Sequence, residues 1–442
     1  MNHSFKLLFS AAALACSLEA GAQLSSNPDK FLGNITTDYS VDYGKEPFYT
    51  LWNQITPENE SKWDQIEGQR RGSFNWYNCD NIYDYAKRNG FPFKFHTLIW
   101  GSQYPNWMNS LSADEQYKAI EEWMDAIKAR YPELPMIDVV NEAITGHAPA
   151  PYKAALGGDG FTGYDWIIRA FEMAHERWPD AILIYNDYNT FQWQKTQFID
   201  LVRTLRDAGA PIDAYGCQSH DLTDMDAGMF RAAMDEIQNA LRMPMYSTEY
   251  DIGSTNDSYQ LQRFKEQIPY MWEADYVAGV TLWGYIYGHT WVNDKDTGAK
   301  GISGIIKDGQ DRPAMTWLRE YMQTEAAKTA KSPFPGMVKE ASVYVKCGNV
   351  NVCVGDEVNI MVSARLKTKT IDHIDLYVGG QRLTTLTAEP YQATVSANVL
   401  GRTDVRAVVV ATDGSQYERW SGFNTYPQRV PYNGGVDVPG TI

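Results

Sequence analysis

The chain has 442 residues, with 39 Lys and Arg against 55 Asp and Glu, so its formal net charge at pH 7 is −16. A chain this acidic lacks the clustered positive charge that binding to phosphates requires, which excludes nucleic acid as a partner. The length allows two domains, and the 14 Trp and 28 Tyr suit either a large core or exposed rings that stack on the C–H faces of sugars.

The first 22 residues have the features of a signal peptide. Lys6 supplies a positive charge, Leu7–Ala15 is an apolar run too short to span a bilayer, and Ala20–Ala22 fits a small-residue cleavage site. We therefore expect a secreted, extracellular protein whose mature chain begins near Gln23. Lipid attachment at Cys16 is the alternative. No later run is long enough for a transmembrane helix.

From about residue 31 to residue 324, short apolar runs alternate with longer amphipathic ones. The predicted strands are Phe31–Ile35, Leu51–Thr56, Phe93–Leu98, Met136–Asn141, Ile182–Asn186, Tyr215–Ser219, Met245–Thr248 and Val277–Trp283. The predicted helices are Ala113–Arg130, Tyr164–Trp178, Thr196–Ala208, Met229–Leu241, Tyr259–Trp272 and Ala314–Lys328. This alternation predicts an α/β fold, a (β/α)₈ TIM barrel. A doubly wound sheet is the weaker prediction, because no Gly-rich phosphate loop follows the first strand.

Two of these strands lead into a carboxylate. Ile137–Val140 reads as a buried strand and runs into Asn141 and Glu142, and the seventh predicted strand runs into Glu249. A lone Glu at a strand end is often a salt-bridged structural residue. Two such carboxylates in one fold are what acid/base hydrolysis of a glycosidic bond requires.

Polar and aromatic residues also follow most of the other predicted strands. They include Glu58, Asn59, Lys62, His96, Trp100, Gln103, Tyr188, Gln218, His220, Trp283 and Trp291. Taken singly, a His can be a satisfied core residue and a Lys a solvated surface charge. Because the active sites of barrel enzymes gather at the C-terminal ends of the strands, the joint placement predicts a long sugar-binding cleft.

Several motifs together resemble family 10 of the glycoside hydrolases, the endo-β-1,4-xylanase family. They are Thr56–Trp63, His96–Trp100, Asp138–Ala143, Gln218–His220, Thr248–Ile252 and Arg312–Ala314, in family order, and the resemblance covers about residues 24–324. It implies a retaining, two-step hydrolysis of xylan and xylo-oligosaccharides. Glu142 would be the acid/base, Glu249 the nucleophile, and no metal or other cofactor would be needed.

The resemblance also implies positions for the substrate-binding residues. It places Glu58, Asn59 and Lys62 one sugar out on the non-reducing side, His96, Trp100, Asn141, Gln218 and His220 around the reacting ring, and Trp283 and Trp291 above it. Gln103 and Tyr188 are further candidates.

The chain departs from the family pattern at two places, Gly101, where members usually carry His, and Gly284–Trp291. These departures affect the predicted shape of the cleft and its tolerance for substituted xylan. Two alternatives stay open, an endo-β-1,4-glucanase or other barrel glycosidase with the same two Glu, and a catalytically silent sugar-binding protein.

The sequence pattern changes after the predicted barrel. We expect a signal peptide at 1–22, a catalytic barrel at 23–329, a Pro/Gly-containing linker at 330–336, a small immunoglobulin-like β-sandwich at 337–428 and a tail at 429–442. Ile374–Val378 and Arg382–Leu386 flank Gly379 and Gly380 as a hairpin. A spacer role is favoured over sugar binding, and we expect a monomer.

Two further features of this region carry predictions. Cys347 and Cys353 flank a short loop and are expected to pair in an oxidising compartment, whereas the sequence leaves open whether Cys79 and Cys217 pair or are free and buried. The tail resembles the lead-in to a family 6 carbohydrate-binding module, so the chain is either a fragment of a longer protein or ends in a relic.

Overall fold

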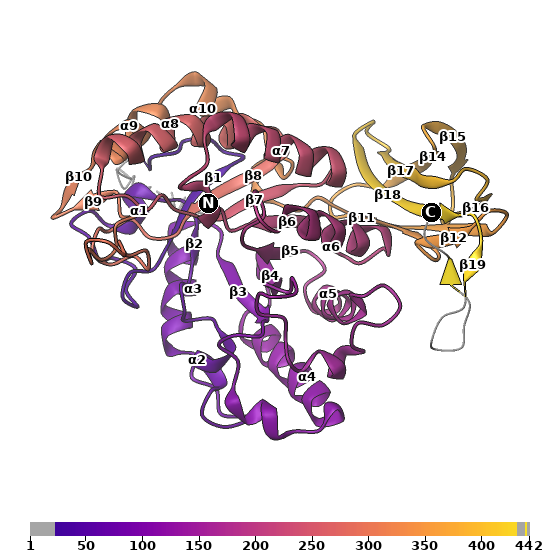
Figure 1. Ribbon diagram of the computed structural model, residues 1–442, viewed down its shortest axis with the longest axis horizontal. Coiled ribbons are helices and arrows are strands. Elements are labelled where there is room, and N and C mark those ends of the chain that lie inside the picture. The colour runs from indigo at the N-terminus through magenta and orange to yellow at the C-terminus, as the bar shows by residue number, and fades with distance from the viewer. Residues whose placement is uncertain (1–22, 431–437, 440–442) are drawn as a thin grey trace, which may run out of the picture.

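A ring of eight parallel strands forms the larger part of the molecule (Figure 1). The computed structural model describes residues 23–430 and 438–439, so the predicted signal peptide, Cys16 and most of the tail lie outside the described residues. The strands are β1 Phe31–Ile35, β2 Ile55–Thr56, β3 Lys94–Ile99, β4 Met136–Asn141, β5 Ile182–Asp187, β6 Ala214–Cys217, β7 Met245–Tyr250 and β8 Val277–Leu282. An isolated parallel bridge between Ile55 and Phe93 joins β2 to β3 and closes the barrel. The predicted (β/α)₈ fold is confirmed.

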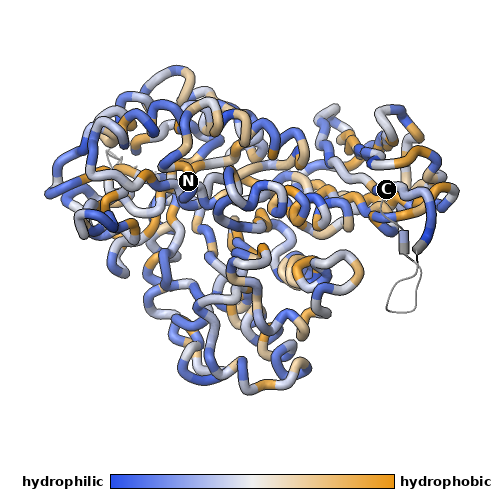
Figure 2. Tube along the Cα trace, in the orientation of Figure 1, coloured by the Kyte–Doolittle hydropathy of each residue, from blue (hydrophilic) through white to orange (hydrophobic). Residues whose placement is uncertain are grey.

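Helices on the outside of the ring follow the strands. They are α1 Phe48–Leu51, α2 Trp63–Glu67, α3 Tyr77–Asn89, α4 Ala113–Arg130, α5 Asp165–Arg177, α6 Lys195–Asp207, α7 Ala227–Leu241, α8 Asp257–Glu273, α9 Pro313–Tyr321 and α10 Glu325–Thr329. Local sequence sets their ends. Ser112 and Glu115 form a capping box before α4, and Gly90 ends α3 in the left-handed conformation. Figure 2 shows apolar residues gathered along the inner strands and hydrophilic residues in the outer loops.

Two predicted elements are wrong in part. The predicted strand Leu51–Thr56 is a strand only over Ile55–Thr56, because Phe48–Leu51 forms α1, which buries Phe48 and Leu51. The predicted helix Ala314–Lys328 is two helices, since the Thr324 hydroxyl caps a new helix at Glu325.

The N-terminal end of the barrel is filled by an aromatic stack. The rings of Phe31 and Tyr246 lie 5.7 Å apart, and Tyr246 stacks in turn on Phe334 at 6.3 Å. Close packing also fixes Gly279 on β8, because an added Cβ there would lie 2.6 Å from the Phe31 ring. Phe334 belongs to the predicted linker and is 9% exposed. Phe334 is therefore packed into the barrel core, although Lys331, Pro335 and Gly336 of the same predicted linker are exposed.

The C-terminal residues form a small two-sheet β-domain. One sheet contains β11 Ala341–Cys347, β13 Glu357–Leu366 and β16 Gln392–Ser396; the other contains β12 Asn351–Cys353, β18 Gln416–Tyr426, β17 Gly401–Ala411, β14 Ile371–Val378 and β15 Gln381–Leu386. The short pairs β9 Ile306–Lys307 with β10 Gln310–Asp311 and β19 Arg429–Val430 with β20 Val438–Pro439 complete the described strands. The hairpin at Gly379 and Gly380 is confirmed, with both glycines at positive φ. The immunoglobulin-like assignment stays a prediction.

The predicted disulfide is wrong. Cys347 and Cys353 are both free and buried, as are Cys79 and Cys217. Cys347 lies on β11 in one sheet and Cys353 on β12 in the other, and the Cys347 thiol faces the Ser421 hydroxyl at 3.4 Å.

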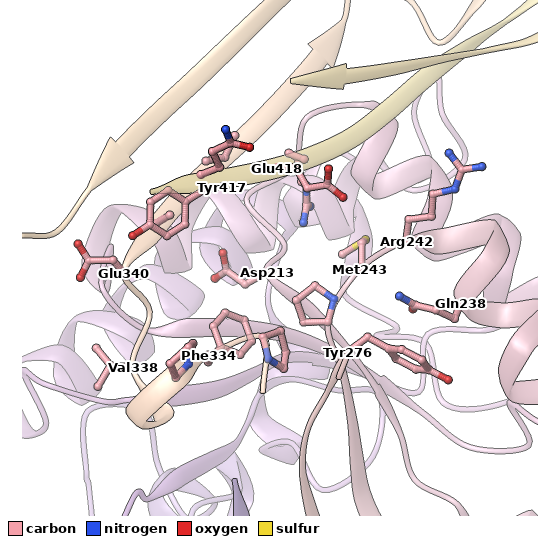
Figure 3. A pocket seen from close by; sticks show the side chains of 17 residues that line it. Asp213, Gln238, Arg242, Met243, Tyr276, Phe334, Val338, Glu340, Tyr417 and Glu418 are labelled. Atoms are coloured by element: carbon pink, nitrogen blue, oxygen red, sulfur yellow. The ribbon is translucent and has the colours of Figure 1, made fainter. Parts of the chain in front are cut away.

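Buried charges join the β-domain to the barrel. Lys339 Nζ lies 2.7 Å from Asp213 Oδ2 and donates to the Tyr344 hydroxyl at 3.0 Å, and the Lys339 and Asp213 side chains are 1% and 6% exposed. Figure 3 looks into a cavity of about 350 Å³ at this junction, lined by Tyr417 of β18 and by Phe334. The β-domain is thus fixed to the end of the barrel that lies opposite the strand C-termini.

Candidate active site

A cleft with a volume of about 770 Å³ lies at the C-terminal ends of the barrel strands. It is lined by Lys62, His96, Trp100, Glu142, Tyr188, Asn189, Gln192, Trp193, Gln218, His220, Asp221, Thr223, Asp224, Glu249, Trp283, Trp291, Val292 and Lys295. Ten of the predicted site residues therefore line one cleft, namely Lys62, His96, Trp100, Glu142, Tyr188, Gln218, His220, Glu249, Trp283 and Trp291.

Glu142 follows directly after β4 and has a positive φ of 55°. A non-glycine residue in this region costs about 1–3 kcal/mol, and such strain is typical of functional sites. Its Oε1 accepts a hydrogen bond from Gln218 Nε2 at 3.0 Å and its Oε2 accepts one from Trp100 Nε1 at 2.9 Å. Burial raises the pKa of this carboxyl above its usual range and the charge of Glu249 adds to the rise, while the Gln218 bond opposes it.

Glu249 lies within β7, one residue before its end. Its Oε1 accepts from Asn186 Nδ2 at 2.8 Å, and its Oε2 lies 3.1 Å from His220 Nε2. Burial alone would raise the pKa of this carboxyl, but the bond from His220 and the positive charges of His96 and Lys94 lower it to about 2. The two buried carboxylates of the cleft therefore have pKa values shifted in opposite directions, which assigns one as a proton donor and the other as an anion.

His220 stands between two carboxylates. Its Nδ1 lies 3.0 Å from Asp251 Oδ2, opposite its contact with Glu249. Burial would lower the pKa of this imidazole, but Asp251 and Glu249 together raise it to about 10. Asp251 also accepts a hydrogen bond from Trp291 Nε1 at 2.7 Å. The charged His220 thus donates to Glu249 and holds it ionised.

Four predicted residues meet at the β2 and β3 end of the cleft. Lys62 Nζ donates to Asn59 Oδ1 at 3.0 Å and to Gln103 Oε1 at 2.7 Å, and lies 5.1 Å from the Trp100 ring centre. Burial lowers the pKa of Lys62 while nearby carboxylates oppose the shift. The group presents a buried cation and two amides to a ligand.

Glu58 lies beside this group. Burial raises the pKa of its carboxyl to about 7, although Lys62 opposes the shift. Its backbone N–H donates to the Thr36 hydroxyl, and within the described residues its carboxyl oxygens accept no hydrogen bond. The Glu58 carboxyl is therefore available to hydroxyl groups of a ligand.

Asn141 is held at the base of the cleft. Its Oδ1 accepts from Asn186 Nδ2 at 3.0 Å and from Gln218 Nε2 at 3.4 Å. Its buried Nδ2 has no partner among residues 23–430 and 438–439. An unmade hydrogen bond at a buried donor is costly, so a hydroxyl group that reaches this amide would be bound favourably.

Aromatic rings and His96 complete the walls. His96 Nδ1 lies 2.9 Å from Asp138 Oδ2, and its ring packs on the edge of Trp283 at 5.6 Å. Trp283 is 6% exposed and Trp291 is 53% exposed. Tyr188 stacks on His147 at a ring distance of 3.7 Å. The predicted aromatic positions therefore lie around the cleft, with Trp291 the more accessible of the two tryptophans.

Sequence reasoning missed the role of Asn186. This residue lies one position before the end of β5 and connects both carboxylates, since its Nδ2 donates to Glu249 and its carbonyl accepts from the Glu142 N–H at 2.9 Å. Asp251 was missed as the partner of His220. Asn186 ends a predicted strand and Asp251 lies three residues after another, and this position at the strand ends is the signal that would have found them.

The Gly101 departure has a local explanation. A Cβ on Gly101 would lie 2.4 Å from the Ala148 carbonyl oxygen and 2.3 Å from that of Pro149. The Gly101 N–H donates to the Ala148 carbonyl at 2.9 Å. The loop after β4 therefore occupies the space that a side chain at position 101 would take.

Two structural findings concern the described residues as a whole. No group of three or more His, Cys, Asp or Glu side chains among them is placed to hold a metal ion. In the same part of the chain, no helix combines the length and apolar character needed to cross a membrane.

Comparison with known proteins finds a family and relatives that match the barrel region. The family model described as Glycosyl hydrolase family 10 matches residues 29–321. Endo-1,4-beta-xylanase B of Cellvibrio japonicus (strain Ueda107) is 47% identical over 290 residues, which is 65% of this chain but 45% of that protein. Endo-1,4-beta-xylanase B of Paenibacillus barcinonensis is 28% identical over 273 residues, 55% of this chain and 80% of that protein.

Solved structures show the same barrel. Native xylanase 10B from Thermotoga maritima matches with a TM-score of 0.59 and 23% identity, over 69% of this chain and 98% of that one. The structure titled GH10 from Paenibacillus barcinonensis matches with a TM-score of 0.59 and 26% identity, over 66% of this chain and 95% of that one. The similarity thus covers the barrel.

Proposed function

The chain belongs to glycosyl hydrolase family 10, and we propose that it is an endo-β-1,4-xylanase that cleaves internal bonds of xylan with retention of anomeric configuration. The names of its relatives support this substrate. One observation supports the mechanism above all others, namely the opposite pKa shifts of the two cleft carboxyls, Glu142 and Glu249.

The first step uses both carboxyl groups. Glu249, ionised because the pKa of its carboxyl is about 2, attacks the anomeric carbon and forms a glycosyl ester. Glu142, which keeps its proton because burial raises the pKa of its carboxyl, gives that proton to the departing glycosidic oxygen. The bond to the leaving sugar breaks as the Glu249–carbon bond forms.

The second step reverses these roles. Glu142, now an anion, removes a proton from water, which attacks the anomeric carbon and releases Glu249. The donors that hold Glu249 in the free enzyme, Asn186 and His220, are positioned to stabilise it again as a leaving carboxylate. Two inversions at one carbon give net retention.

The cleft residues bind sugar hydroxyls around the reacting centre. The unpaired Asn141 Nδ2 is suited to donate to the hydroxyl next to the anomeric carbon, a contact that strengthens in the transition state. Lys62, Asn59 and Glu58 are suited to the next sugar on the non-reducing side.

Product analysis tests the stereochemistry. Proton NMR of the first product released from xylohexaose should show the β-anomer before mutarotation. If the α-anomer comes first, hydrolysis is inverting and the role of Glu249 is wrong.

Activity on two polymers tests the substrate. Initial rates on soluble xylan should greatly exceed those on carboxymethylcellulose at the same concentration. Comparable or higher activity on the cellulose derivative would assign the protein as an endo-β-1,4-glucanase, and no activity on either would favour the silent sugar-binding alternative.

The proposal places the enzyme outside the cell, since residues 1–22 have the sequence features of a signal peptide. N-terminal sequencing of protein from the culture medium should begin near Gln23. A lipid-modified protein beginning at Cys16 in the membrane fraction would favour the alternative.

A further inference from the structure

Trp193 is an exposed aromatic residue in the wall of the cleft. Its side chain lines the same cavity as Glu142 and Glu249, yet 69% of its surface is exposed, more than that of Trp291. A large apolar ring left open to water in a concave site is typical of a binding surface rather than of a core.

The position of Trp193 in the barrel places it on one side of the bond that is cleaved. The loop that carries it follows β5, and β5 neighbours β4, which delivers the proton donor Glu142. In the closed ring of eight strands, β1 lies opposite β5 and β2 lies opposite β6. Trp193 is therefore at the end of the cleft away from Lys62 and Asn59, on the leaving-group side.

The loop that presents Trp193 is firmly anchored. The backbone N–H groups of Phe191 and Gln192 both donate to Asp221 Oδ2, at 3.0 and 3.1 Å, and the Gln192 side chain donates to the Asp221 carbonyl. The Phe191 ring is buried and packs on the edge of Phe230 at 5.5 Å. Phe191 and Gln192, which precede Trp193 in the chain, are therefore held in place. A ligand that binds to Trp193 thus does not have to order a mobile loop, and little conformational entropy is lost.

Polar side chains share the cleft with this ring. Gln192, Thr223, Asp224 and Lys295 line the same cleft as Trp193. An apolar plane flanked by hydrogen-bonding groups suits a pyranose ring, which has apolar C–H faces and hydroxyls at its edge.

We propose that Trp193 is a stacking platform for a sugar residue of the leaving group. This inference rests on the proposed function. It makes Trp193 a specificity-determining residue, because substrates with several sugars downstream of the cleaved bond gain a contact that short substrates lack.

The test compares substrates that do and do not reach Trp193. In Trp193→Ala, kcat/KM on xylohexaose should fall about tenfold, the ratio that corresponds to ~1.4 kcal/mol. An aryl xylobioside carries no sugar in its leaving group, so its kcat/KM should be unchanged. With xylohexaose labelled at its reducing end, cleavage should shift towards bonds that have fewer downstream sugars. Trp193→Phe should retain most of the wild-type pattern.

Tyr77→Ala is the matched control. Tyr77 is 71% exposed at the start of α3 and does not line the cleft, so its replacement should leave kcat/KM unchanged for both substrates. If Trp193→Ala leaves xylohexaose cleavage unchanged, or lowers activity on both substrates equally, the platform is overturned while the xylanase function stands. A wild-type enzyme inactive on both substrates overturns the proposed function and this inference together.

Discussion

The Nε2 atom of His220 lies 3.1 Å from Oε2 of Glu249, and this pair sets the charge of the Glu249 carboxyl group. Asp251 lies 3.0 Å from the other ring nitrogen and keeps the imidazole protonated. The carboxylate is thus paired with a cation that is itself paired, which holds the pKa of Glu249 near 2 despite burial.

Replacing His220 by Gln should shift the acidic limb of the pH–rate profile to higher pH. The amide keeps the approximate size but removes the positive charge, so the pKa of Glu249 should move from about 2 towards its ordinary 4.5. The profile of kcat/KM against pH should lose its acidic side at higher pH than in the wild type. An unchanged acidic limb would show that His220 does not control the ionisation of Glu249.

The same pair predicts the pH dependence of stability. The pKa of His220 is raised from 6.5 to about 10, so its contribution to the free energy of unfolding is complete below pH 6.5 and is lost as the pH rises through 10. The pKa of Glu249 is lowered from 4.5 to about 2, so its contribution is present above pH 4.5 and is lost as the pH falls through 2. Urea unfolding should show a smaller loss between pH 6.5 and 10 for His220→Gln than for the wild type. Equal losses would contradict the linkage.

Chemical rescue should separate the roles of Glu142 and Glu249. Glu142→Ala should lower kcat on xylan by about 10²–10⁴-fold, since the leaving sugar needs a proton. On an aryl glycoside with an acidic phenol it should show a burst of phenol, and azide should restore turnover with a β-glycosyl azide as product. Glu249→Ala should be inactive on both substrates and yield at most the α-azide. Exchanged products would reverse the assignment.

Breaking the buried pair between the domains should destabilise the protein. Lys339→Met leaves Asp213 buried without its cation, at a cost of about 3–5 kcal/mol in the free energy of unfolding. Arg365→Ala is the control, because its ion pair with Asp180 also joins the domains but is exposed and contributes about 0–1 kcal/mol. Denaturant unfolding measures both. Equal effects would mean that the buried pair does not hold the domains together.

Thiol titration should find no disulfide in the mature chain. Cys79, Cys217, Cys347 and Cys353 are free in the structure, so the denatured, unreduced protein should react with four equivalents of a thiol reagent. A reaction with only two equivalents would indicate that Cys347 and Cys353 form the predicted disulfide.

Local patterns in the sequence predicted much of the barrel. Phe31–Ile35 and Met136–Asn141 were predicted to the residue, as was helix Ala113–Arg130, because continuous apolar runs and a capping box mark their limits. Both cleft carboxylates were found for the same reason, since each ends a run that reads as a buried strand.

Long-range packing accounts for most of the failures. His220 was expected near the reacting ring, but its link to Asp251 and the bridging role of Asn186 depend on how neighbouring strands align. The junction of Lys339 with Asp213 joins residues that only the folded chain brings together. Local composition at residues 330–336 is typical of a linker, and only the tertiary contacts show that Phe334 packs on Tyr246.

The Phe334 ring has a consequence for how the enzyme can be divided. The match to the family model ends at residue 321, yet the floor of the barrel is completed by an aromatic ring at residue 334. A polypeptide cut at the homology boundary would carry every catalytic group and still lack a piece of its own interior. During synthesis, the same ring reaches the barrel only after all eight strands have been made, so the barrel of this chain is finished by a residue that lies beyond the match to the family model.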